Sequence, residues 1–249
     1  MLFFKKKQTL TSLIFIINTI FFFLFFFLFS IFPELDIKVA KLFFFDGVFL
    51  SEKYEIIKFV RTFLKNIMIL IPVISIIYLL FVYINKKQNI IITKKYKKLR
   101  NILVSIGFLI GPIVGCGIIA NLYFKDTWGR ARPVNIEEFG GTKIYTPPFI
   151  KSDQCKKNCS WIGGESAAAF SFLVGVVILK SSTKLIYANI LFGLTVSLFR
   201  MLMGGHFLSD NLFSAFFMIY LALIYKTGIL FILKKKNILK NLITLNVNK

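Results

Sequence analysis

Charged side chains are scarce in this chain: Asp, Glu, Lys and Arg make up 17% of its 249 residues, whereas hydrophobic residues make up 57%. So few charged groups cannot cover the surface of a water-soluble globule, which argues against an ordinary soluble fold. Internal repeats and low-complexity linkers are absent from the sequence as well. The long apolar runs that remain favour a single membrane-embedded unit.

Acidic residues are the scarcest charged groups, with 11 Asp and Glu against 32 Lys and Arg and a formal net charge of +21. Such an excess of positive charge is typical of nucleic-acid-binding proteins and of membrane proteins. The Lys residues cluster beside apolar runs, where the positive-inside bias places them and where they favour an anionic cytoplasmic leaflet. We therefore expect a lipid bilayer as the surroundings, and neither a nucleic acid nor a protein partner.

Six apolar stretches are long enough to cross a bilayer, which takes about 20 helical residues. They span approximately residues 10–32, 64–85, 101–123, 166–181, 185–203 and 211–233, and the fourth is the shortest. Because the hydrocarbon core offers no water to backbone polar groups, all six are expected to be helices. The predicted fold is an all-α integral membrane protein with six transmembrane helices.

The first stretch is interpreted as a signal anchor. It follows a basic start at residues 5–7, but it is too long for a signal-peptide core and lacks a small-residue cleavage site. Residues 33–63 mix charged and apolar groups, which suggests an interfacial amphipathic helix. We accordingly divide the chain into 1–63, the signal anchor with an extracytoplasmic interfacial segment, and 64–249, the membrane-embedded core.

Orientation follows from the segments between the stretches. Basic residues fill the N-terminus, the link at 86–100, the turn at 180–184 and the tail after 233, and all of these alternate onto one side. That side is predicted to be the cytoplasm. All eleven acidic residues fall in or beside the opposite segments. Both termini are therefore predicted to be cytoplasmic.

The three cysteines divide into two kinds. Cys116 lies in an apolar run and is interpreted as a small packed residue. Cys155 and Cys159 lie in a polar loop, where such a pair indicates metal or redox chemistry in a cytosolic protein and a disulfide on an oxidising face. We favour the disulfide.

Two cations lie at the end of the third stretch. Lys125 and Arg132 are seven positions apart, so on a continuing helix they share one face. A point charge and a planar fork together suit a phosphate group. The alternative is a pair of snorkelling side chains at the membrane edge. For Arg130, which points elsewhere on such a helix, we prefer this structural interpretation.

Two glycines precede the fourth stretch. Gly163 and Gly164 leave backbone N–H groups open to an anion at a helix N-terminus, where the helix dipole favours negative charge. The alternative is a tight turn followed by Glu165, whose carboxylate favours the same dipole. This segment decides little by itself.

His206 is the only histidine in the sequence. Asp210 follows four residues later, where its carboxylate can bind one ring nitrogen and orient the other. Arg200 lies near the end of the fifth stretch, and an ionisable residue in such apolar surroundings is a functional candidate. The alternative for a single histidine is a structural role.

These segments are all predicted to open on the same face of the membrane. Three cations, Gly-rich amides and a His–Asp pair describe a phosphate pocket with a nucleophile. No Asp, Glu and His cluster has metal-ligand spacing, so we expect neither a metal nor a cofactor.

The segments resemble the three signatures of the phosphatidic acid phosphatase type 2 (PAP2) superfamily. Residues 125–133 match its Lys-x6-Arg-Pro motif, and Arg200-x5-His206-x3-Asp210 matches the core of its Ser-Arg-x5-His-x3-Asp motif. Residues 159–167 resemble the Pro-Ser-Gly-His motif in position alone. The resemblance covers roughly residues 101–225 and implies the helical bundle of that family.

The resemblance implies a metal-independent mechanism. His206 would attack phosphorus to form a phosphohistidine, and Asp210 would orient the imidazole. The expected phosphate ligands are Lys125, Arg132, Arg200, Gly163 and Gly164.

The second motif departs from the family pattern. Ile162 replaces its Pro, Gly163 its Ser and Glu165 its His, while Phe199 replaces the Ser of the third motif. A carboxylic acid can serve as a general acid where burial raises its pKa. We therefore predict that Glu165 protonates the leaving group in place of the histidine.

Residues 125–165 look most like bacterial lipid A phosphatases of this superfamily. The favoured reaction is removal of the 4′-phosphate, and removal of the 1-phosphate is the alternative. We expect it at the outer leaflet of the bacterial inner membrane, with the site facing the periplasm. Undecaprenyl pyrophosphate and phosphatidylglycerophosphate are alternative substrates. Two other classes remain: a catalytically impaired homologue that binds lipid phosphate, favoured by the altered second motif, and a transporter or channel.

Overall fold

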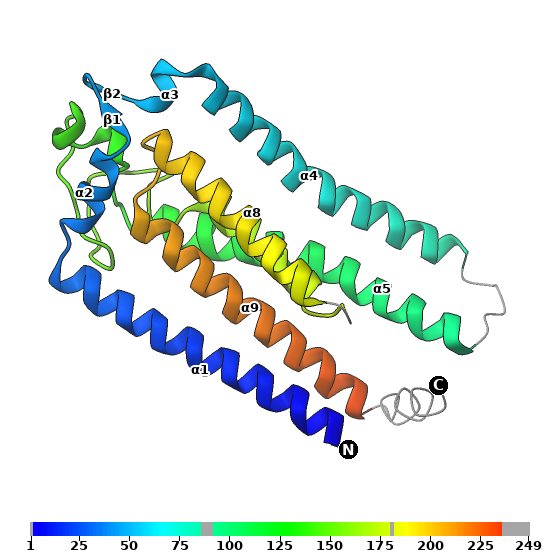
Figure 1. Cartoon of the computed structure of the whole chain (residues 1–249). Coiled ribbons are helices and arrows are strands. Elements are labelled where there is room, and N and C mark those ends of the chain that lie inside the picture. Colours follow the sequence, from blue (N-terminus) through cyan, green and yellow to red (C-terminus); the bar gives the residue numbers. More distant parts are fainter. Residues whose placement is uncertain (1, 86–91, 180–181, 236–249) are drawn as a thin grey trace.

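The described chain is mostly helical, which confirms the predicted class. The structure is a computed structural model and describes residues 2–85, 92–179 and 182–235. Its long helices lie side by side as a bundle (Figure 1). These helices are α1 Leu2–Ile31, α4 Glu55–Ile84, α5 Ile92–Ile110, α8 Ser182–Leu202 and α9 Leu208–Lys235.

The shorter elements lie between the long helices. Residues 35–53 contain α2 Leu35–Lys41, the antiparallel strands β1 Phe44–Phe45 and β2 Val48–Phe49, and α3 Leu50–Lys53. Helix α5 continues directly into the π-helix η1 Gly111–Lys125. After it come the 3-10 helices η2 Pro133–Asn135 and η3 Glu137–Phe139, and then α6 Gly164–Ser171 and α7 Leu173–Val176.

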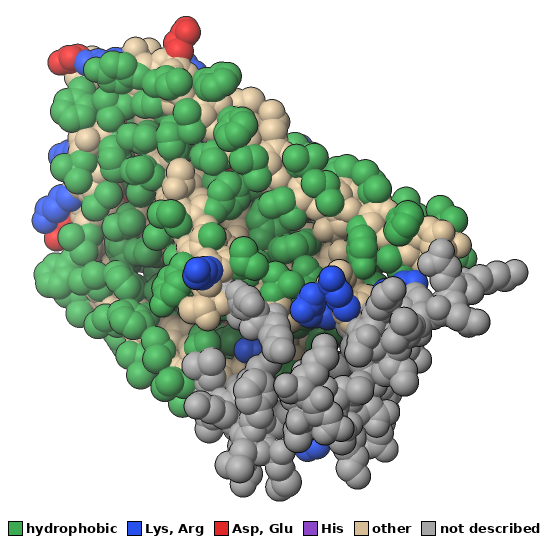
Figure 2. Space-filling model, turned by 45° about the vertical axis from the view of Figure 1, so that its right-hand side comes forward, with side chains coloured by type: hydrophobic (Ala, Val, Ile, Leu, Met, Phe, Trp, Pro, Cys, Tyr) green, Lys and Arg blue, Asp and Glu red, His purple; other side chains and the backbone are tan. Residues whose placement is uncertain are grey.

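Five of the described helices are long and apolar enough to cross a membrane. They are Thr11–Ile31, Glu55–Ile84, Lys97–Lys125, Thr183–Leu202 and Leu208–Lys234. These correspond to the first, second, third, fifth and sixth predicted stretches. Large apolar side chains are exposed along α1, α4 and α8. Figure 2 shows hydrophobic side chains over most of one face, with acidic side chains at its upper and left edges.

The fourth predicted span corresponds to the short helices α6 and α7. Residues 164–176 are about 20 Å long at 1.5 Å per residue, less than the roughly 30 Å of a hydrocarbon core. Most of their side chains are buried, because α6 packs on α8, α9 and η1 while α7 packs on α5 and α9. Burial inside the bundle therefore explains this apolar sequence, and a sixth span stays a prediction.

Helix α4 begins earlier than its apolar run. The sequence places an interfacial segment up to residue 63, but α4 already starts at Glu55. Charged side chains in its first turns find partners at the end of the bundle: Lys58 contacts Glu52, and Arg61 contacts Glu165. These charged residues interrupt the apolar sequence pattern but not the helix. The boundary that we placed between residues 63 and 64 therefore falls inside α4.

The π-helical stretch begins beside a proline. Pro112 has no N–H to donate back along the helix, and the helix changes from α to π geometry at Gly111. The stretch then runs to Lys125, so it delivers that side chain to the end of the bundle.

The N-terminal helix packs on the core through aromatic rings. Phe22 of α1 meets Phe213 of α9 edge to face, with ring centroids 5.2 Å apart. Polar contacts cross the same interface, since the Thr19 and Tyr220 hydroxyls are 2.8 Å apart. Helix α2 therefore starts four residues after a helix that packs on α9.

Three connecting segments lie at one end of the bundle (Figure 1). They are residues 33–54, the loop 126–163 and the turn 203–207.

Close approach of two backbones joins α5 to α7. A Cβ atom built on Gly107 would lie 2.7 Å from Cα of Gly175, closer than real Cβ atoms come. Gly107→Ala is therefore expected to separate the helices and destabilise the protein by about 1–3 kcal/mol.

The measurement is thermal unfolding of the purified protein in detergent. Gly228→Ala in α9 is the matched control, because a Cβ there meets nothing within 4 Å. Equal unfolding temperatures for the two variants would contradict the close packing of α5 on α7.

Candidate active site

The residues singled out from the sequence come together at one end of the bundle. They come from the end of η1, the following loop, the start of α6, the end of α8, the turn after it and the start of α9. A backbone hydrogen bond of 3.1 Å from the Gly163 N–H to the Asp210 carbonyl joins α6 to α9. The Ser214 hydroxyl lies within hydrogen-bond distance of both carbonyls, 2.9 Å from that of Gly163 and 2.8 Å from that of Asp210, and shares its one proton between them. These hydrogen bonds fix the position of the second motif, residues 159–167, relative to the third motif, residues 200–210.

This arrangement corrects one expectation. The Gly163 N–H already donates to the Asp210 carbonyl, so it is not open to an anion as its position before a helix led us to expect. Gly164 has another use: a Cβ on it would lie 2.9 Å from Nζ of Lys125. Glycine at this position lets the Lys125 ammonium lie against the first turn of α6.

Asp210 is completely buried and held by several donors. Its Oδ1 accepts a 2.6 Å hydrogen bond from Nη1 of Arg130, and its Oδ2 accepts from the Ser160 hydroxyl and from the Phe207 N–H at 2.8 Å. The same Oδ2 lies 3.6 Å from Nδ1 of His206. A carboxylate fixed in this way is placed to orient the imidazole, and such catalytic contacts are often long before substrate binds.

Arg130 is the centre of this network, and the interpretation of it as a snorkelling side chain is wrong. It is 0% exposed and lies between two buried carboxylates. Nη2 donates to Asp36 at 2.7 Å, opposite the Asp210 contact, and Nε donates to the Thr146 carbonyl at 2.8 Å. The Phe207 ring covers the guanidinium, 4.4 Å from Cζ.

Asp36 links the N-terminal part of the chain to the site. It comes from α2 and accepts from the Ser209 N–H at 2.9 Å as well as from Arg130. Burial raises the pKa of Asp36, and Arg130 opposes this. Burial likewise opposes the charge of Arg130, but Asp210 and Asp36 outweigh it, so the pKa of Arg130 is raised. Sequence reasoning missed Asp36 because nothing in its local pattern sets it apart.

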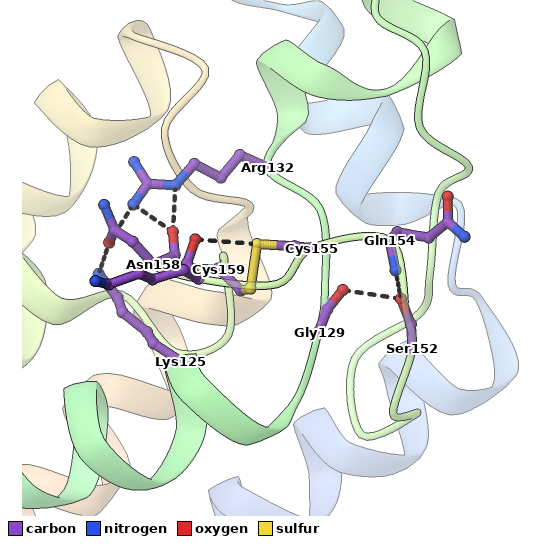
Figure 3. The surroundings of a disulfide bond; sticks show 9 residues. Lys125, Gly129, Arg132, Ser152, Gln154, Cys155, Asn158 and Cys159 are labelled. Carbon is purple, nitrogen blue, oxygen red and sulfur yellow. Dashed lines mark hydrogen bonds between the residues drawn. A yellow bond between two sulfur atoms is a disulfide. The ribbon is translucent and has the colours of Figure 1, made fainter.

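Lys125 and Arg132 converge, but not on one helical face as predicted. The helix ends before Gly129, whose φ of 72° turns the chain away. Asn158 brings the two cations together: its Oδ1 accepts from Nη2 of Arg132 at 2.7 Å and from Nζ of Lys125 at 3.4 Å (Figure 3). Burial lowers the pKa of Arg132.

A disulfide closes the loop that carries Asn158. Cys155 is joined to Cys159, the pairing that their place in a polar loop favoured (Figure 3). Asn158 has a positive φ of 53°, a conformation that Asn tolerates better than most residues. Cys116 is a free, partly buried thiol.

Glu165 has partners that the sequence did not suggest. Both of its carboxylate oxygens accept hydrogen bonds from Arg61 of α4, and Oε1 also lies 3.8 Å from Nη1 of Arg200. A general acid must carry a proton, whereas these contacts are those of a carboxylate. The arrangement therefore favours another role for Glu165.

Metal binding finds no support among the described residues, which contain no group of three His, Cys, Asp or Glu able to hold an ion. The expectation of a metal-free site stays a prediction.

Three comparisons with known proteins bear on the site. A family model of the PAP2 superfamily matches residues 102–232. The lipid A 4'-phosphatase of Francisella tularensis subsp. novicida is 34% identical over 207 residues, which cover 81% of this chain and 89% of that protein. The lipid A 4'-phosphatase of Rhizobium leguminosarum is 25% identical over 150 residues, covering 59% of this chain and 63% of that protein. No solved structure matches the chain significantly.

The protonation state of His206 can be measured directly. Burial lowers its pKa to about 3; Asp210 opposes this shift, while the charges of Lys125 and Arg200 add to it. The imidazole is therefore expected to stay neutral, as a nucleophile must be, down to about pH 4. Because the chain has one histidine, nitrogen NMR of ¹⁵N-histidine-labelled protein in detergent reports this residue alone. Titration near pH 6.5, as in the denatured control, would contradict the burial argument.

The buried Arg130 network predicts a large stability effect. Arg130→Ala leaves two buried carboxylates without their shared cation, which is expected to cost about 3–5 kcal/mol in the free energy of unfolding. Lys156→Ala in the same loop region is the control, because its side chain is exposed. Thermal unfolding in detergent compares the two, and an Arg130→Ala protein as stable as the control would exclude the proposed charge balance.

Proposed function

Because this chain belongs to the PAP2 superfamily, we propose that it removes the 4′-phosphate of lipid A through a phosphohistidine intermediate. The chain is a multi-pass membrane protein and a lipid phosphatase. The observation that carries the mechanism is the buried His206, whose Nδ1 lies 3.6 Å from Oδ2 of Asp210. Support for the substrate comes from the relatives named above, of which the first aligns along 89% of its length.

The reaction proceeds in two steps. His206 attacks phosphorus with Nε2, since Nδ1 faces Asp210. The N–P bond forms as the P–O bond to the lipid breaks, and the leaving oxygen takes up a proton from solvent water. A water molecule then attacks phosphorus and returns a proton to the solvent, the N–P bond breaks, and inorganic phosphate leaves with His206 restored.

The cations stabilise the charge that develops on the phosphoryl oxygens. Lys125 and Arg132 approach from one side through the Asn158 loop, and Arg200 approaches from α8. Arg200 is buried and its Nε has no hydrogen-bond partner among the described residues, so it has donors to offer a ligand. Gly164 places Lys125 at the start of α6. No step requires a metal ion or a cofactor.

The proposed location is the bacterial inner membrane, with the site facing the periplasm and both termini in the cytoplasm. This orientation rests on the Lys-rich links, which alternate with the segments that carry the site. It requires α6 and α7 to complete a sixth crossing. A disulfide in the site loop suits an oxidising compartment.

Lipid A analysis tests the substrate. Cells that express the chain are expected to carry lipid A without its 4′-phosphate, and cells that express His206→Ala are expected to retain it. Mass spectrometry with fragmentation distinguishes the 4′- from the 1-phosphate. Loss of the 1-phosphate would support the second position, and an unchanged pattern would exclude lipid A.

The purified protein tests the reaction itself. His206→Ala is expected to lower phosphate release by roughly 10³-fold or more, because it removes the nucleophile. Undecaprenyl pyrophosphate and phosphatidylglycerophosphate serve as alternative substrates in the same assay. Lipid binding without phosphate release from any of them would identify a catalytically impaired homologue.

A further inference from the structure

Arg61 reaches the candidate site from outside the segment that carries the motifs. It lies in α4, whereas the family model begins at residue 102. Its Nε donates a 2.9 Å hydrogen bond to Oε2 of Glu165, and its Nη2 donates to Oε1. The two residues are 104 positions apart, and the pair forms a two-pronged contact between α4 and α6.

Glu165 connects this arginine to a second one. Its Oε1 lies 3.8 Å from Nη1 of Arg200 on α8. Gly205 leaves room for the Arg200 guanidinium, since a Cβ there would lie 2.8 Å from Cζ. One carboxylate thus lies between two guanidinium groups that come from different helices.

A purely structural tie explains this arrangement poorly. The side chains of Arg61 and Glu165 are 28% and 24% exposed, so solvent screens the pair and limits what it adds to stability. The pair also lies next to Arg200, which has a buried Nε without a partner among the described residues. Positive charge at this place exceeds what one Glu165 can balance.

We propose that Arg61 is a fourth cationic ligand of the substrate phosphate, and that Glu165 is a positioning residue that holds Arg61 and Arg200 beside His206. This inference rests on the proposed phosphatase function. A phosphate monoester carries nearly two negative charges and several acceptor oxygens, which suits a fork from Arg61 in addition to the other three cations. Glu165 then acts as an anion throughout the reaction and is not the general acid.

The dependence of the rate on the leaving group shows whether Glu165 is a general acid or a positioning residue. Loss of a general acid slows esters with poor leaving groups and spares those with good ones, whereas loss of phosphate positioning slows both alike. The substrates are two phosphate monoesters with the same acyl chain, one releasing an alkoxide and the other a nitrophenolate. Rates are measured for wild type, Arg61→Ala, Arg61→Lys, Glu165→Gln and the double variant Arg61→Ala/Glu165→Gln.

The proposal predicts a parallel loss. Arg61→Ala and Glu165→Gln are each expected to lower kcat/KM by about 10- to 100-fold on both esters, and the double variant is expected to be little worse than Arg61→Ala. Arg61→Lys should restore part of the rate at most, because an ammonium lacks the planar fork. Lys58→Ala, one turn away in α4 and outside the site, is the matched control and should keep wild-type rates.

Two results would overturn the proposal. A Glu165→Gln loss confined to the alkyl ester, with a shifted alkaline limb of the pH profile, would make Glu165 the general acid. If Arg61→Ala kept wild-type rates on both esters, Arg61 would not bind the substrate phosphate and would serve only to connect α4 to α6.

A binding measurement with inorganic phosphate gives a second test, which does not depend on turnover. Inorganic phosphate is titrated into ¹⁵N-histidine-labelled protein, and the His206 signal reports occupancy. Arg61→Ala is expected to weaken binding by at least tenfold relative to Lys58→Ala. Unchanged binding would overturn the role of Arg61, and phosphate binding by a wild type that releases no phosphate would reject the proposed function while leaving the binding role of Arg61 supported.

Discussion

The guanidinium of Arg130, held between Asp36 and Asp210, is the constraint on which the site depends. Three charged side chains share a volume without solvent, where an unpaired charge is very costly. Each ion is tolerated because the other two are present and because further donors and acceptors complete their hydrogen bonds. The segment after α1, the loop after η1 and the start of α9 must therefore assemble together before Asp210 can orient His206.

The carboxylate of Asp210 is fully hydrogen-bonded, whereas the guanidinium of Arg200 is not. Asp210 has its oxygens occupied by Arg130, Ser160 and the Phe207 N–H, so it cannot turn away from the imidazole. By contrast, Arg200 keeps an unpaired Nε, and a neutral amide oxygen of Asn158 holds Arg132. Phosphate oxygens bind such donors more strongly than an amide does, so the site combines a rigid support with cations that favour an anion.

Sequence patterns identified what local spacing and hydropathy can encode. Five long apolar helices, the convergence of three motifs and the cysteine pair all follow from neighbouring residues. Arg130 and Arg61 were missed because their partners lie 94 and 104 positions away, and no local rule distinguishes them from snorkelling cations. The short buried helices α6 and α7 resemble a span because a bundle interior and a bilayer select the same side chains.

The role of Glu165 shows why position in a motif does not fix chemistry. A glutamate where the family has histidine adds a negative charge next to the phosphate site, which by itself would repel the substrate. Arg61 of α4 supplies the opposite charge through two hydrogen bonds, so the pair is neutral as a whole. A neutral pair can stand beside an incoming phosphate as a neutral histidine would, and Arg200 also neighbours Glu165, with its Nη1 3.8 Å from Oε1. The substitution therefore changes which group meets the phosphate, and it leaves the charge balance of the site intact.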